Sequence, residues 1–186
     1  PNPCPKETRM NKTLIATVIA LATAGAQAQA PTPVAIGMSG WTGFAPLTLA
    51  KEAGIFKKNG LDVTINKIPQ KDRHLAIASG AIQCAATTVE TWIVWNANGV
   101  PTTQIFQLDK SFGADGMVVK PTLMRIADLK GKTVAADAPG TATYFTLAWM
   151  LKKNGLSIKD VNVVNLAPQA AANAMIAGTA QIDAGM

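Results

Sequence analysis

Residues that usually carry catalysis are scarce in this sequence. It has one histidine, two cysteines and one tyrosine in 186 residues. The motifs G-x-S-x-G, H-E-x-x-H and C-x-x-C are absent, as are Walker-type and G-x-G-x-x-G loops. The single histidine, His74, stands beside Asp72 and Arg73 on a short predicted helix, where a structural role is favoured over that of a general base. We therefore expect a binding protein with no catalytic residues, no metal and no cofactor.

Cysteine and charge patterns exclude two further classes. Cys4 and Cys84 are too few for a disulfide or metal framework, and Cys84 lies in an apolar run where a buried, inert thiol is expected. Three of the 17 basic residues and one of the 11 acidic residues precede Gln29, which leaves 14 against 10, or +4. These charges are scattered rather than gathered in a stripe with aromatic residues, so nucleic-acid binding is not expected.

No apolar run is long enough to span a bilayer, which needs about 20 residues. The longest one, residues 13–25, follows the short basic start Met10-Asn11-Lys12 and precedes the small residues AQAQA. This order is typical of a secretory signal peptide. We assign the signal peptide to residues 10–28, because cleavage after Ala30 would put Pro31 beside the scissile bond, and we expect a periplasmic protein. Residues 1–9 fit no signal and are read as a non-native or mis-started extension.

The remaining sequence is internally duplicated. Three landmarks recur in the same order at nearly one spacing, of 95 residues for the first and 98 for the others: KKNGL at 57–61 and 152–156, Thr-Leu-Ala at 48–50 and 146–148, and Ser79-Gly80 matched by Ala177-Gly178. Three matches at one offset indicate two copies of one structural unit.

Each copy predicts the order strand, loop, helix, strand, helix, strand. The first copy gives 33–38, 39–46, 47–58, 61–68, 71–80 and 81–88, and the second gives 132–137, 138–141, 142–153, 161–166, 169–177 and 180–185. A helix over 91–97 and strands over 102–108 and 116–123, the last broken by Pro121, lie between them. Alternating strands and helices favour parallel sheets, hence an α/β protein of two lobes. We expect the first lobe at 29–120 and the second at 121–186.

Ligands of open α/β sheets bind beyond the carboxyl ends of the strands. The loop 137–144 is one candidate, since Gly140 permits close backbone approach and Thr141 and Thr143 add hydroxyls beside unpaired helix N–H groups, which attract anions. Thr141 could equally cap its own helix. In the first copy, Trp41 in the loop 39–44 is assigned to the wall of a cleft.

The segment ATTVETW, residues 86–92, raises a second choice. Thr87 or Thr88 ends a strand and starts a helix, where it faces the cleft, while Thr87 and Glu90 also have the spacing of a capping box. We favour the capping role for Glu90 over contact with a ligand cation. Asp115 is a turn residue by default. Trp92 and Trp95, three residues apart on one helix, are expected in the core.

The secretory leader, GWTGFAPLTLAKEAGIFKKNGLDV, the pattern A-x-x-S-G-A-I-Q and DLKGKTVAADAPGTATYFTLAWMLKKNGL together resemble the solute-binding proteins of ABC importers for nitrate, taurine and aliphatic sulfonates. The resemblance implies the type II periplasmic binding-protein fold, which encloses a small anion between two hinged lobes and delivers it to a permease in the inner membrane. By this resemblance Trp41, Thr42, Gly43, Thr87 and Thr88 would contact the ligand from the first lobe, and Gly140, Thr141 and Ala142 would contact the anion from the second. We add four further candidate ligand contacts from the same loops and turns: Glu90, Asp115, Thr143 and Tyr144.

Two alternatives share this scaffold. One is a thiamine-pyrimidine binder or enzyme, although the cysteine-rich signature of that enzyme is missing. The other is the effector domain of a transcription regulator, which is disfavoured because a leader occupies the place of its DNA-binding helices. Members of the resembled family are usually much longer, so we expect a fragment with a truncated second lobe, uncovered apolar surface and a tendency to self-associate.

Overall fold

The computed structural model describes residues 30–178 and 182–186, of which Thr32–Met186 form one compact unit. The expected signal peptide and the extension before it lie outside the described residues. The first copy contains β1 (Thr32–Met38), η1 (Thr42–Phe44), α2 (Ala45–Glu52), α3 (Ile55–Lys58), β2 (Leu61–Lys67), η2 (Gln70–Asp72), α4 (Arg73–Ala78), β3 (Cys84–Ala85) and α5 (Val89–Ala97). The second contains β4 (Val118–Val119), η3 (Ile126–Leu129), β5 (Thr133–Ala136), α6 (Ala142–Lys153), η4 (Ile158–Asp160), β6 (Asn162–Asn165), α7 (Pro168–Ile176) and β7 (Ala184–Gly185).

Two sheets with the same core topology confirm the duplication. The first has the order β2-β1-β3 and the second β4-β7-β5-β6, and all pairings except the antiparallel β4–β7 pair are parallel. Even the register repeats: Ala35 pairs with Thr64, and Thr133 pairs with Asn162, with both partners 98 residues further on. The predicted α/β class is therefore correct. The short β4 joins the second sheet, ahead of the lobe boundary expected after Lys120.

The alternation of side chains along β1 places helices on both faces of the first sheet. Ile36 and Met38 belong to an apolar cluster with Leu47 of α2, to which Phe56 of α3 adds a partly buried ring. Gly37 faces the other way, because a side chain there would meet the stem of Arg73 in α4. The first lobe is thus a sheet between two helical layers.

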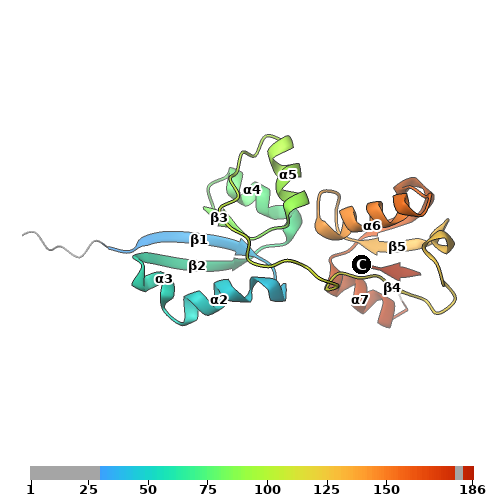
Figure 1. Cartoon of the computed structure of the whole chain (residues 1–186), viewed down its shortest axis with the longest axis horizontal. Helices are drawn as coiled ribbons and strands as arrows, with labels where there is room; N and C mark the ends of the chain where they lie inside the picture. Colours follow the sequence, from blue (N-terminus) through green and yellow to red (C-terminus); the bar gives the residue numbers. More distant parts are fainter. Residues whose placement is uncertain (1–29, 179–181) are drawn as a thin grey trace, which may run out of the picture. The chain divides into compact units, whose positions relative to one another are not determined.

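The second sheet follows the same rule. Val134 and Ala136 of β5 pack with Leu147 and Leu151 of α6, while Ala135 between them packs with Ala171 of α7. Figure 1 shows α6 and α7 on opposite sides of β5. This arrangement positions the N-terminus of α6 just beyond the carboxyl end of β5, where the sequence predicts a binding loop.

Several predicted elements differ from the structure. The helix expected over 47–58 is divided into α2 and α3, because Gly54 between them adopts a left-handed conformation with φ of 70°. The strand expected over 81–88 is only the two residues of β3, and that over 116–123 only the two of β4.

The strand predicted over 102–108 is wrong, since these residues have no regular structure. The backbone N–H of Thr102 donates to the side chain of Asn96 (3.0 Å), and its carbonyl accepts from Trp92 Nε1 (3.2 Å). Side chains of α5 therefore satisfy the backbone groups that a neighbouring strand would have bound.

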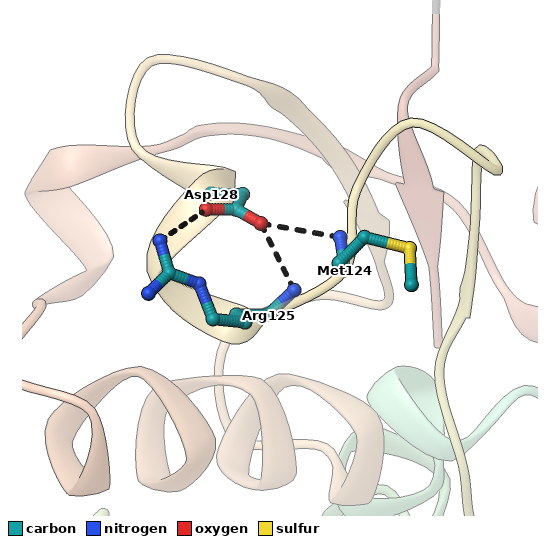
Figure 2. A network of polar contacts seen from close by, with 3 residues as sticks. All are labelled: Met124, Arg125 and Asp128. Atoms are coloured by element: carbon teal, nitrogen blue, oxygen red, sulfur yellow. Dashed lines mark hydrogen bonds and ion pairs between the residues drawn. The ribbon is translucent and has the colours of Figure 1, made fainter.

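Carboxylates fix turns of the second lobe. Asp128 accepts hydrogen bonds from the backbone N–H groups of Met124 (3.1 Å) and Arg125 (3.0 Å), and the Arg125 guanidinium donates to its other oxygen (3.2 Å), as Figure 2 shows. Asp183 accepts from Lys120 Nζ (2.9 Å) and from the backbone N–H of Thr133 (3.0 Å). The bond from the backbone N–H of Met124 is the main cause that lowers the pKa of Asp128. The bond from Lys120 is the main cause that lowers the pKa of Asp183.

Acid should therefore destabilise the second lobe. A carboxylate whose pKa is lowered by folding stabilises the protein above its unfolded pKa, and this stability is lost as the pH falls toward its folded value. We expect Asp183→Asn to lower the free energy of unfolding at pH 7 by about 1 kcal/mol, a figure that allows for solvent screening, and to flatten its decline below pH 5. Urea titrations at pH 7, 5 and 3.5 measure this. Asp62→Asn, at an exposed strand residue, is the matched control, and an equal effect of both variants would contradict the assignment.

Candidate ligand-binding site

A buried arginine joins the strand ends of the first lobe. Arg73 is 1% exposed, and its Nε and Nη1 donate to the carbonyls of Ile68 (2.9 Å) and Ala86 (2.6 Å), which follow β2 and β3. Its third nitrogen, Nη2, is buried with no hydrogen-bond partner among the described residues. A buried charged donor without a partner is costly, so this nitrogen marks a place where an acceptor would be favourable.

The charge of Arg73 persists despite its burial. Desolvation lowers the pKa of Arg73 to about 10, and the negative charge of Asp137 partly offsets that shift. The guanidinium thus remains positive at neutral pH. Asp137 is itself buried, follows β5, and accepts a bond from the backbone N–H of Ala138 (2.7 Å). The carboxyl ends of both sheets therefore carry a buried charge, one of each sign.

A polar cluster surrounds Gln70, the residue that begins η2 just after β2. Its Nε2 donates to the hydroxyls of Thr91 (2.9 Å) and Thr88 (3.1 Å), and Thr87 lies at 3.4 Å. The Oε1 of the same amide accepts from the backbone N–H of Ala142 at 3.4 Å. We call Gln70, Thr87, Thr88, Thr91 and Ala142 the Gln70 cluster. It brings Thr87 and Thr88 of the first copy to the predicted loop of the second.

The N-terminus of α6 has no cap of its own. Thr141 is the N-cap residue, but its hydroxyl donates to the carbonyl of Ala138 (2.7 Å) and makes no capping bond. The first bond to the helix runs from the N–H of Phe145 to the carbonyl of Thr141. Preceding N–H groups of a helix have no acceptor within it and carry partial positive charge. The capping interpretation of Thr141 is therefore wrong, and the helix end remains available.

The other residues of this loop shape the backbone. Gly140 has a φ of 87°, and a side chain there would press on Val94 of α5. Thr143 accepts a hydrogen bond from the backbone N–H of Asp137 (3.0 Å), and Tyr144 is half-buried. Gly140 and Ala142 thus contact the first copy, while Thr143 fixes the loop that leads to them.

The remaining predicted contacts lie apart from this cluster. Trp41 is half-buried and packs against the core of the first lobe; Thr42 is exposed; Gly43 lies where a side chain would collide with Trp41 and Asp109. Asp115 is exposed and accepts a hydrogen bond from Ser111. Within the described residues, no hydrogen bond or ion pair joins these side chains to the Gln70 cluster, so their role as ligand contacts stays a prediction.

The capping box predicted for Thr87 and Glu90 is wrong. The N-cap residue of α5 is Thr88, and it makes no side-chain capping bond. Its hydroxyl donates instead to Thr91 Oγ1 (3.0 Å), three residues on. The T-x-x-E spacing is one residue out of step with the start of the helix. Glu90 lies in the first turn and is half-buried, and its side chain makes no hydrogen bond within the described part of the chain.

Sequence reasoning missed Gln70 and Arg73. The rule that ligands bind beyond strand ends was applied after the first and third strands, but not after the second, where Ile68-Pro69-Gln70 occupies the same edge. His74 is half-buried beside Trp95, with ring centroids 6.3 Å apart. A structural role fits it best.

A cavity of about 110 Å³ lies beside the cluster. Residues from α4 and α5 and the loop before α6 line it: Lys71, His74, Val94, Trp95, Asn98, Pro139 and Gly140. Its wall contains the rings of His74 and Trp95 and one lysine, so it suits a small organic group rather than water alone. Trp95 is buried, as expected for a core residue, yet it borders this cavity.

The described residues contain neither a metal-ligand cluster nor a membrane-spanning helix. No three histidine, cysteine or acidic side chains among residues 30–178 and 182–186 gather as metal ligands would. Within the same ranges no helix is long and apolar enough to cross a bilayer.

Comparison with known proteins identifies the family. A family model described as NMT1/THI5 like matches residues 41–186. The chain belongs to the NMT1/THI5-like family. No curated protein matches it.

Solved structures agree with this family. This NMT1/THI5-like chain resembles the alkanesulfonate-binding protein SsuA from Xanthomonas axonopodis pv. citri, bound to MOPS, at 26% identity and a TM-score of 0.65 over 85% of this chain and 55% of that one. It also resembles the periplasmic aliphatic sulphonate binding protein SsuA from Escherichia coli, at 23% identity and a TM-score of 0.61 over 84% and 54%. The fold is therefore that of type II periplasmic binding proteins, and the chain spans about half the length of these relatives.

Proteins with this fold bind ligands of different chemical classes. Tv2483, solved with bound L-arginine, matches with a TM-score of 0.53 at only 14% identity. That protein carries an amino acid on the same architecture, so the ligand class of the NMT1/THI5-like chain has to be argued from its own residues.

Proposed function

We propose that this chain is the solute-binding part of an ABC importer and captures a small organic anion beside the N-terminus of α6. One observation carries the proposal: the end of α6 has no cap of its own, and Gln70 of the neighbouring lobe reaches its first N–H at 3.4 Å from among three threonine hydroxyls. Helix N–H groups, threonine hydroxyls and an arginine all favour negative oxygen atoms. Closure of the two lobes on the ligand would be stabilised by contacts from both.

The cavity beside Gly140 supports an organic anion over an inorganic one. Nitrate fills only the charged end of such a site, whereas an alkyl or ring substituent would extend against Trp95. The SsuA relatives are named as sulfonate-binding proteins, which supports the sulfonate class for this chain. The Escherichia coli relative is named as periplasmic, and this name and the predicted leader support capture outside the cytoplasm and delivery to an inner-membrane permease.

Binding of the anion should depend on the N–H of Ala142. Proline is well tolerated at the first position of a helix, and Thr141 before it is extended (φ −101°, ψ 163°), as a residue preceding proline should be. Ala142→Pro therefore removes one donor with little cost to the fold. We expect it to weaken anion binding about tenfold, while Ala142→Ser, which retains the N–H, has a much smaller effect.

A thermal-shift screen and calorimetry of the mature full-length protein test this. The ligands are ethanesulfonate, MOPS, taurine, nitrate, acetate and a thiamine pyrimidine. A ligand that binds only the folded state stabilises it by about 2.7 kcal/mol at a hundredfold excess over Kd. A sulfonate shift that Ala142→Pro reduces and Ala142→Ser retains supports the proposal. A shift with the pyrimidine alone, or one insensitive to Ala142→Pro, overturns it.

A further inference from the structure

The side-chain amide of Gln70 has a fixed orientation. Its two amide hydrogens face three hydroxyls, those of Thr91, Thr88 and Thr87. Its oxygen faces the N–H of Ala142. If the amide were rotated by half a turn, its NH₂ group would face the Ala142 N–H, and two donors would oppose each other. The hydrogen-bond network therefore holds Oε1 at the N-terminus of α6.

This oxygen occupies the position that an anion would take. Thr141 bonds to Ala138 rather than capping α6, so the acceptor for the first N–H of the helix comes from the other copy. At 3.4 Å the contact is longer than the usual 2.7–3.2 Å of an N–H···O bond. It is consequently weak enough for a charged oxygen to displace.

A second observation indicates that an anion would displace it. Arg73 is 1% exposed, and its Nη2 has no hydrogen-bond partner in the described residues. Asp137, at the base of the loop that leads to α6, acts on the charge of Arg73. The amide oxygen of Gln70 is neutral, so it satisfies the helix end without adding negative charge near these residues. An anionic oxygen would bond to the same N–H and would also act through space on the guanidinium, as the charge of Asp137 does.

We propose that Gln70 is an internal place-holder: its Oε1 links the two lobes through α6 when no anion is bound, and an anion must displace it. The proposal rests on the proposed function, because it presumes that anions bind at the end of α6. The strength of the contact between Gln70 Oε1 and the N–H of Ala142 then sets how tightly an anion must bind to displace it. The threonine hydroxyls keep the amide oriented, so that it returns to the helix end when the anion leaves.

Two variants separate a place-holder from a ligand contact. Gln70→Ala removes the competing oxygen, so binding of ethanesulfonate should become about two- to fivefold tighter, as for loss of one weak neutral hydrogen bond. Gln70→Glu puts a permanent carboxylate at the helix end, so binding should weaken at least tenfold. Gln169 in the first turn of α7 bonds only to Asn173 and is exposed, which makes Gln169→Ala and Gln169→Glu matched controls.

The link between lobes is measured without any ligand. Spin labels at Lys58→Cys in α3 and Lys152→Cys in α6, in a background with Cys84→Ala, report the distance between the lobes of the mature full-length protein. Both lysines are exposed. Without an anion, Gln70→Ala should broaden the distance distribution toward longer separations, and Gln70→Glu should keep the short one. The Gln169 variants should match wild type.

Each outcome has one meaning. An unchanged distance distribution in Gln70→Ala overturns the link, and weaker ethanesulfonate binding by that variant overturns the place-holder, since Gln70 would then contact the anion. If wild type binds no anion but Gln70→Ala still separates the lobes, the proposed function fails while the link between lobes is supported. Tighter binding together with the wider distribution supports the proposal in full.

Discussion

Arg73→Ala is expected to lower the free energy of unfolding by about 3 kcal/mol. The guanidinium is 1% exposed and donates to the carbonyls of Ile68 and Ala86, so its removal leaves two buried acceptors without partners. The stem of the side chain also fills the space above Gly37, and its loss leaves a cavity. Urea unfolding followed by circular dichroism measures the loss.

Arg73→Met distinguishes packing from hydrogen bonding. Methionine retains most of the aliphatic volume and removes a charge whose burial is costly enough to lower the pKa of Arg73 to about 10. We expect this variant to lose roughly half as much stability as Arg73→Ala. If Arg73→Ala falls within about 0.5 kcal/mol of wild type, the guanidinium does not hold the strand ends together.

Leu147→Ala should destabilise the second lobe by about 3 kcal/mol, within the usual range for a buried leucine. Leu147 is fully buried in the cluster that contains Val134, Leu151 and Val161. Truncation removes apolar contacts and leaves a cavity between α6 and β5. Thermal unfolding and urea titration of wild type and variant measure this effect.

Leu49→Ala is the matched control for Leu147→Ala. It makes the same chemical change in α2, at a side chain that is 66% exposed. Its effect should remain within about 0.5 kcal/mol of wild type. Similar losses from both substitutions would show that the cluster around α6 is less tightly packed than the structure indicates.

Residues that typically begin or end a helix predicted the bounds of α6 correctly. Residues 142–153 were expected to be helical and are α6, because Pro139-Gly140 precedes them and Asn154-Gly155 follows them. The parallel pairing of β1 with β2 and of β5 with β6 follows from the repeated alternation of strands and helices. By contrast, residues 102–108 were expected to form a strand but have no regular structure, and the backbone groups of Thr102 are bound by side chains of α5.

The candidate site was only partly predictable, because its key contacts depend on residues far apart in the chain. The burial of Arg73 depends on two carbonyls that follow separate strands, which no local pattern reveals. Threonine before a helix favours a cap, yet Thr141 bonds backward to Ala138. Gln70 joins the site only through hydroxyls and an N–H that lie 17 to 72 residues away.

One buried pair changes its chemistry between the two copies. Gly37 and Arg73 of the first copy correspond to Ala135 and Ala171, 98 residues further on, which pack together in the second. Both helix positions are 1% exposed. The same place beside the central strand thus holds a cation that joins two strand ends in one copy and an apolar contact in the other. The duplication has kept the backbone topology, while the chemistry beside the central strand has diverged.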